Sequence, residues 1–209
     1  DHEKPNAKGE RKSRGQTCQS ACGCKNRIGG CMEHILVVVD MQNDFIDGAL
    51  GTKEAREIVE AAAEKIREFK GSIYGTLDTH SKDYLSTQEG KNLPVPHCIL
   101  GEEGWALHPD IMDAISETEA EVMDFCRKDT FGSIELCELL KQKYEGKDAE
   151  IEFIGLCTDI CVISNALMVK AALPEAKLIV HADLCAGVTK ESHDNALSAM
   201  KMCQVDIQF

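Results

Sequence analysis

The stretch Ile35-Leu36-Val37-Val38-Val39 is an uninterrupted apolar run, and all of its members except Leu36 are β-branched. A strand with one solvated face alternates apolar and polar residues, whereas a continuous run is typical of a parallel strand covered by helices on both faces. We therefore predict that this run is a central strand of a parallel sheet.

Segments of strand and helix character alternate downstream of this run. Residues 53–69 carry apolar side chains at helical spacing, and Gly71 follows them, as is usual at the end of a helix. By the same reasoning we predict strands at 72–77, 122–126, 151–156, 177–180 and 205–207, and helices at 133–144, 159–173 and 190–202. This order predicts an α/β fold: a three-layer, doubly wound, mostly parallel six-stranded sheet with helices on both faces.

Residues 78–121 interrupt the alternation, and we expect them to form a long loop. Loops of this length inside a compact domain are usually functional or disordered. The segment contains histidines and carboxylates that can bind a metal. It is therefore a candidate site.

The length and charge of the chain indicate one domain with an N-terminal tail. We predict a polar tail at residues 1–31, with net charge +4, and a folded domain at 32–209, with net charge −17. An acidic domain argues against nucleic acid as a partner, because binding to a duplex depends on Lys and Arg. No apolar run reaches membrane-spanning length and no signal peptide is evident, so we expect a cytoplasmic protein without membrane contact.

Two hypotheses concern the tail. Its cysteines, at positions 18, 22, 24 and 31, could bind a metal, although their spacing is not that of a known zinc site. Alternatively, Gly29-Gly30 is the translation of a ribosome-binding sequence and Met32 is the true start. The other seven of the eleven cysteines lie beyond residue 97, and without a secretory signal we expect reduced thiols.

Chemically distinctive residues follow the predicted strands. In an open parallel sheet, ligands bind at the carboxyl ends of the strands. There the sequence places Asp40, then Asp78 and His80, then Lys128, and then the segment 158–161, which ends in Cys161. A carboxylate, metal ligands, an ammonium and a thiol are thus expected at one edge.

Cys161 opens the helix predicted after the fourth strand, with Thr158 or Asp159 as its N-cap. The positive end of a helix lowers the pKa of a thiol and can hold an oxyanion, which suits a nucleophile. The competing interpretation is a buried cysteine that packs as a small apolar residue. For Asp40 the alternatives are a proton acceptor stabilised by Lys128 and a carboxylate that caps a turn.

Three segments in this order resemble the isochorismatase-like cysteine hydrolases: Val39-Asp40-Met41-Gln42-Asn43-Asp44-Phe45, Lys128 after a strand, and Gly155-Leu156-Cys157-Thr158-Asp159-Ile160-Cys161-Val162. The resemblance covers about residues 34–208. It implies a catalytic triad of Asp40, Lys128 and Cys161. It also implies a cis peptide at Leu156–Cys157 and an oxyanion hole formed by the N–H groups of Cys157 and Cys161.

Within this superfamily the chain resembles the nicotinamidase, or pyrazinamidase, branch. The resemblance implies one divalent metal ion, zinc with iron or manganese as alternatives, bound by Asp78, His80, Glu89 and His97. Tyr84 occupies the place of a usual histidine ligand, and Glu89 can supply the missing donor. Hydrogen-bonded loop residues without a metal are the competing interpretation.

The implied function is hydrolysis of nicotinamide to nicotinate and ammonia through a thioester. Phe45 and Phe131 match positions that line the aromatic pocket of the family, and Trp105 is a further pocket candidate. The expected partner is a small-molecule amide, and we expect a homo-oligomer. Two alternatives remain: another amidohydrolase of this superfamily, acting on a small amide or ureido acid, and a non-catalytic, thiol-rich metal-binding or redox protein.

Overall fold

A computed structural model of the chain describes residues 31–209. The hypotheses about the N-terminal tail lie outside the described residues, apart from Cys31, which is exposed. Among the described residues, no helix has the length and apolar character required to cross a membrane.

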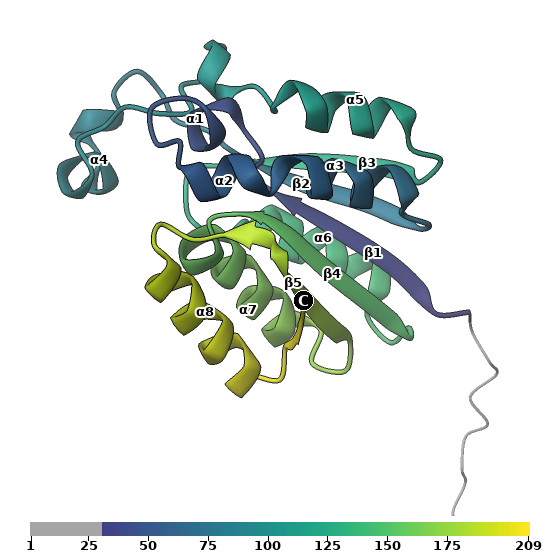
Figure 1. The fold of residues 1–209 in the computed structure, drawn as a ribbon. Helices are drawn as coiled ribbons and strands as arrows, with labels where there is room; N and C mark the ends of the chain where they lie inside the picture. Colours follow the sequence, from purple (N-terminus) through teal and green to yellow (C-terminus); the bar gives the residue numbers. More distant parts are fainter. Residues whose placement is uncertain (1–30) are drawn as a thin grey trace, which may run out of the picture.

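The fold is a six-stranded parallel sheet, and the predicted α/β class is confirmed (Figure 1). The order across the sheet is β3-β2-β1-β4-β5-β6, with β1 hydrogen-bonded to β2 and to β4. This arrangement makes the apolar run at 35–39 a central strand, as predicted. The strands are β1 (Glu33–Val39), β2 (Ser72–Asp78), β3 (Glu121–Lys128), β4 (Ala149–Leu156), β5 (Lys177–Ala186) and β6 (Asp206–Gln208).

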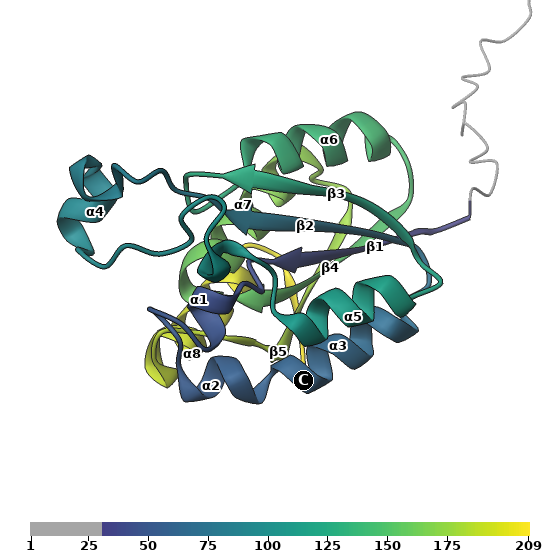
Figure 2. The same ribbon diagram turned by 90° about the horizontal axis from the view of Figure 1, so that it is seen from above.

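Helices cover both faces of the sheet (Figure 2). One face carries α1 (Asn43–Ile46), α2 (Lys53–Glu57), α3 (Val59–Glu68) and α5 (Pro109–Glu117), and the other carries α6 (Ile134–Tyr144), α7 (Ile163–Ala172) and α8 (Lys190–Met202). The side chains of β1 enter two apolar cores in alternation, with Val37 in one and Val38 in the other. Residues 35–39 of this strand are all apolar because they contribute to both cores.

Several element boundaries differ from the predicted ones. The helix predicted at 53–69 is divided at Ile58 into α2 and α3, and the strand predicted at 177–180 continues to Ala186. The prediction of a loop at 78–121 was wrong for its later part, because α5 forms there with Pro109 in its first turn and buries Ile111 and Ala114. The loop also contains η1 (Tyr84–Ser86), α4 (Gln88–Asn92) and η2 (Glu103–Trp105). Figures 1 and 2 show α4 standing apart from the main body.

The nucleophile turn, which we define as residues 157–162, begins where β4 ends. The Leu156–Cys157 peptide is cis, as the resemblance implied. The turn is a π-helical segment, η3 (Thr158–Val162), and its N-cap is Cys157 rather than Thr158 or Asp159. Cys161 therefore lies inside a π-turn that leads into α7, not in a regular first helical turn.

Two backbone features bring β1 and β4 close together at this edge. Gly155 has φ +118°, and a Cβ on it would lie 2.1 Å from the carbonyl oxygen of Val39, so no other residue fits there without displacing the main chain. Asp40, the residue after Val39, has φ +47°, which is uncommon for a residue other than glycine. Left-handed backbone of this kind costs about 1–3 kcal/mol and is frequent at functional sites.

Candidate active site

Asp40, Lys128 and Cys161 meet at the carboxyl edge of the sheet. The Lys128 ammonium lies 2.7 Å from Asp40 Oδ2 and 3.5 Å from Cys161 Sγ. Thr76 Oγ1 donates a hydrogen bond of 2.6 Å to Asp40 Oδ1. All four side chains are buried, so these charges interact in a medium that screens them much less than water does.

The environment keeps the thiol of Cys161 protonated until a base removes its proton. Burial, together with the nearby Asp40, raises the pKa of Cys161 well above its ordinary value. This is opposite to the lowering expected from a helix end, because the desolvation of a buried thiolate outweighs the other effects. Burial also raises the pKa of Asp40, although Lys128 partly offsets that rise. The pair is therefore a buried acid and base beside a fixed cation.

Lys128 remains charged in this buried position. Burial alone would lower the pKa of Lys128, but the carboxylates of Asp40 and Asp78 outweigh it and raise the pKa. Its ammonium also lies 3.2 Å from Asp78 Oδ1. Lys128 thus contacts the candidate base, the candidate nucleophile and Asp78.

The other carboxylate oxygen of Asp78 faces two histidines. His80 Nε2 is 2.9 Å and His97 Nε2 is 3.3 Å from Asp78 Oδ2. One potential ligand atom from each of these three residues lies within 4.8 Å of the others, and all three residues are buried. Although burial would raise the pKa of Asp78, hydrogen bonds from the two histidines hold it below its ordinary value.

The hydrogen bonds of His97 fit a metal ligand. Its Nδ1 lies 2.8 Å from the carbonyl oxygen of Val95, which can only accept, so Nδ1 carries a hydrogen. A hydrogen bond from Nε2 to Asp78 requires a hydrogen on Nε2 as well; when that hydrogen is absent, the Nε2 lone pair faces the carboxylate of Asp78. A cation between these atoms would stabilise the arrangement, and metal-binding histidines usually donate their second ring N–H in this way. The donor set therefore fits a divalent metal ion.

Glu89 lies at the margin of this group. Its Oε1 is 3.7 Å from His80 Nε2 and 3.7 Å from His97 Nε2, and its side chain is 20% exposed. Burial raises its pKa. Tyr84 packs its ring against both histidines and donates its hydroxyl to Leu93 O at 2.9 Å, so its oxygen is directed to the main chain. Glu89 is thus the nearest candidate for a fourth ligand.

An inner cavity of about 240 Å³ is lined both by the Cys161 thiol and by candidate metal ligands. Its lining includes Cys157 and Cys161 together with Asp78, Glu89 and His97. Its other walls are mostly apolar and include Phe45, Leu93, Phe131 and Val188. The cavity suits a small molecule with an apolar body and one reactive polar group.

The structure does not bring Trp105 into this cavity, in contrast to the pocket prediction. Trp105 Nε1 donates to Thr79 Oγ1 at 2.9 Å, and the Arg127 guanidinium lies 5.1 Å from the centre of the ring. Trp105 also packs against the core that contains α3 and α5. These contacts hold the indole away from the cavity.

Three buried polar residues support the site and were not predicted from the sequence. Thr76 contacts Asp40 as described, and Gln42 forms hydrogen bonds with both the N–H and the carbonyl of Asp78. Asn165 donates to Cys161 O at 2.8 Å and accepts from Ser133 N at 2.9 Å, which links the nucleophile turn to the loop after β3. The only sequence signal for Gln42 is its place directly after Asp40 and Met41.

Comparisons with known proteins agree with this geometry. The model of the isochorismatase domain matches residues 34–208. An uncharacterized isochorismatase family protein, PncA of Bacillus subtilis (strain 168), is 30% identical over 177 residues, covering 80% of this chain and 93% of that protein. The nicotinamidase/pyrazinamidase of Mycobacterium tuberculosis (strain ATCC 25618 / H37Rv) is 27% identical over 187 residues, covering 82% of this chain and 96% of that protein.

A comparison with solved structures also finds a similar fold. The pyrazinamidase of Pyrococcus horikoshii, crystallised in complex with zinc, superposes with a TM-score of 0.66 and 28% sequence identity. The match covers 85% of this chain and 99% of that chain. The similarity thus extends over nearly the whole described fold.

Proposed function

Because the chain belongs to the isochorismatase family of hydrolases, we propose that it is a metal-dependent cysteine amidohydrolase that converts nicotinamide to nicotinate and ammonia. The observation that carries this proposal is the position of Lys128, whose ammonium contacts Asp40, Cys161 and Asp78. The ammonium of Lys128 thereby contacts the proposed base, the proposed nucleophile and one proposed metal ligand.

In the first half of the reaction, Asp40 takes the proton of Cys161 while the sulfur attacks the amide carbon. The N–H groups of Cys157 and Cys161 accept the negative charge that develops on the carbonyl oxygen. Asp40 then gives the proton to the amide nitrogen, the C–N bond breaks, and ammonia leaves. The product of this half is a thioester on Cys161.

In the second half, water resolves the thioester. Asp40 takes a proton from water as the oxygen attacks the thioester carbon, and then returns a proton to the sulfur as the C–S bond breaks. Nicotinate and the free thiol result. Throughout, Lys128 keeps Asp40 in position and favours its ionised form.

The substrate is proposed from the walls of the inner cavity. Phe45 and Phe131 provide apolar surface for a flat ring, and the carboxamide reaches Cys161. A divalent ion held by Asp78, His80, His97 and Glu89 would supply a Lewis acid able to bind a pyridine nitrogen. Zinc is the proposed ion, with iron or manganese as alternatives that the same donors accept. We further propose a cytoplasmic homo-oligomer.

A substrate panel tests this proposal. Ammonia release is measured from nicotinamide, pyrazinamide, benzamide and small ureido acids, before and after treatment with a chelator and after zinc is restored. We expect nicotinamide and pyrazinamide to exceed benzamide and to lose their advantage on chelation. Equal rates on benzamide and nicotinamide would remove the case for pyridine recognition by a metal, and preference for a ureido acid would favour the other amidohydrolases.

The thiol-rich redox alternative predicts a different metal site. Within residues 31–209, the one cluster with metal-binding geometry contains an aspartate and two histidines and no cysteine. The proposed enzyme therefore retains its metal after thiol alkylation, whereas a metal-thiolate protein would release it. Metal analysis of the alkylated full chain distinguishes the two.

A further inference from the structure

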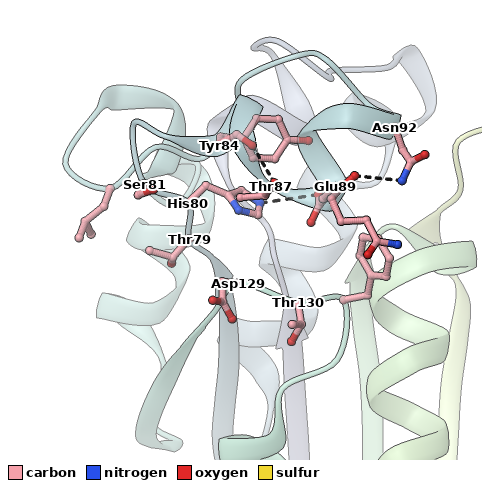
Figure 3. A pocket seen from close by; sticks show the side chains of 12 residues that line it. Thr79, His80, Ser81, Tyr84, Thr87, Glu89, Asn92, Asp129 and Thr130 are labelled. Carbon is pink, nitrogen blue, oxygen red and sulfur yellow. Dashed lines mark hydrogen bonds and ion pairs between the residues drawn. The ribbon is translucent and has the colours of Figure 1, made fainter.

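A second cavity lies beside the candidate metal ligands and has no part in the mechanism above (Figure 3). This outer cavity has a volume of about 630 Å³ and lies between α4 and the loop that follows β3. Figure 3 shows His80 and Glu89 on one side and Asp129 and Thr130 on the other.

The candidate metal ligands form the partition between the two cavities. Glu89 and Phe131 line both cavities, His80 lines only the outer one, and Asp78 and His97 line only the inner one. An ion held by these residues would thus be accessible from two directions. One direction also leads to the nucleophile and the other does not.

The walls of the outer and inner cavities differ in polarity, which affects how a hydrated cation passes through each. The outer cavity presents hydroxyl and amide groups, such as those of Asn92 and Thr130, and the exposed carboxylate of Asp129 beside the apolar surfaces of Leu100 and Phe131, and no Lys or Arg lines it. The inner cavity is walled mainly by aliphatic and aromatic side chains. A cation that crosses apolar surface loses hydration without replacement, which is costly.

The charge of Lys128 adds to this difference. Its ammonium contacts Cys161 and Asp78, both of which line the inner cavity. A dication approaching from that side meets this buried positive charge at short range, where screening is weak, although Asp40 and Asp78 partly neutralise it. Glu89 lines both cavities, whereas the carboxylate of Asp129 lines only the outer one.

We propose that the outer cavity is the port through which a divalent metal ion enters and leaves the site, separate from the cavity that binds the amide. This inference rests on the metal site of the proposed function. The port allows the ion to exchange while a substrate or product occupies the inner cavity. Asn92, Asp129 and Thr130 are assigned to the port and not to metal coordination.

Metal exchange kinetics of the full chain test the port. Uptake of Zn²⁺ by the apoprotein and its loss to a chelator are followed by stopped flow, and the equilibrium Kd is measured separately. Asn92→Trp and Thr130→Trp fill the outer cavity from opposite walls, and Val188→Trp places the same group in the inner cavity. Asp129→Asn removes the charge at the port.

Both outer tryptophan variants are expected to slow uptake and loss by the same several-fold factor, leaving Kd unchanged, because an obstacle on the path alters both rates equally. Asp129→Asn should slow uptake and weaken its dependence on salt. Val188→Trp should leave exchange unchanged and raise KM for the amide. Only Asn92 lies in α4, so equal slowing of metal exchange by Asn92→Trp and Thr130→Trp excludes a local distortion of α4 as the cause of the slowing.

Unchanged exchange in both outer variants, or equal slowing by Val188→Trp, would overturn the port. These outcomes leave metal content and amidase activity of the unmodified protein intact, so they do not bear on the proposed function. A protein that binds no divalent ion would instead overturn the proposed metal site and the port with it.

Discussion

Gln42 holds the main chain of Asp78 from both sides: its Oε1 accepts from Asp78 N at 2.7 Å, and its Nε2 donates to Asp78 O at 2.8 Å. The same Nε2 donates to Trp105 O at 2.7 Å. Gln42 is fully buried. The position of Asp78, which faces both Lys128 and the two histidines, is therefore fixed by an amide side chain from the adjacent strand's end.

Replacing Gln42 by Leu leaves Asp78 N–H and two carbonyls without this partner. We expect a loss of stability of about 1–3 kcal/mol for each buried group left unpaired, and a loss of metal affinity of about 10–100-fold. Urea unfolding and metal titration measure the two effects. Asn43→Leu is the control, because Asn43 donates to Glu103 O on the exposed side of the same segment. Equal metal affinity in the two variants would contradict this role of Gln42.

Replacing Cys161 by Ala should leave the fold intact and reduce ammonia release by at least about a thousandfold, because the proposed thioester forms on Cys161. Cys185→Ala is the matched control: both thiols are buried in the same core, and Cys185 does not line the inner cavity. Intact mass after rapid quenching should show an acylated wild-type enzyme and an unmodified Cys161→Ala variant. Ammonia release from that variant at the wild-type rate would refute the nucleophile.

Replacing Thr76 by Val removes the hydrogen bond to Asp40 Oδ1 with little change of shape. That hydrogen bond lowers the pKa of Asp40, which burial raises, so its loss raises the pKa further. Asp40 must be ionised to accept a proton, and the acidic limb of kcat/KM should therefore move to higher pH. The pH profile on nicotinamide measures this shift. An acidic limb at the wild-type position would show that Asp40 is not the base.

Glu152 provides a test of stability against pH, far from the thiol. Burial alone would raise its pKa, but hydrogen bonds from His181 and Lys65 outweigh burial and lower it to about 2. A depressed folded-state pKa gives stability that is present above the unfolded value of 4.5 and is lost as the pH falls from there toward about 2.

Glu152→Gln should therefore unfold more easily than the wild type at pH 7, and the difference should shrink toward pH 2. Urea unfolding at several pH values measures both. A difference that stays constant between pH 7 and pH 2 would contradict the assigned pKa.

The parallel sheet and the site edge were predictable because they depend on patterns that a sequence displays. A run such as 35–39 is typical of a doubly covered strand, and parallel strands place the residues that follow them, Asp40, Lys128 and Cys161 among them, at one edge. The cis peptide and the metal ligands followed from resemblance, not from periodicity.

Other features depend on contacts that leave no pattern. Gln42 forms hydrogen bonds with main-chain groups, and because every residue has these groups, the sequence does not mark the partner. Trp105 lies outside the cavity because its indole contacts Thr79 and Arg127. Helix α5 was missed because its apolar positions span only one buried turn, from Ile111 to Ala114. The end of β5 was missed because the polar His181 interrupts the apolar run.

The contact between Gly155 and Val39 has a consequence for how this protein can change over generations. The spacing between the base and the nucleophile turn is set by one main chain resting on another, with no side chain between them. Core residues around β1 and β4 can therefore be exchanged for others of similar volume without altering that spacing. Substitutions among these core residues are therefore tolerated, whereas replacing Gly155 by alanine, which adds one methyl group, is not.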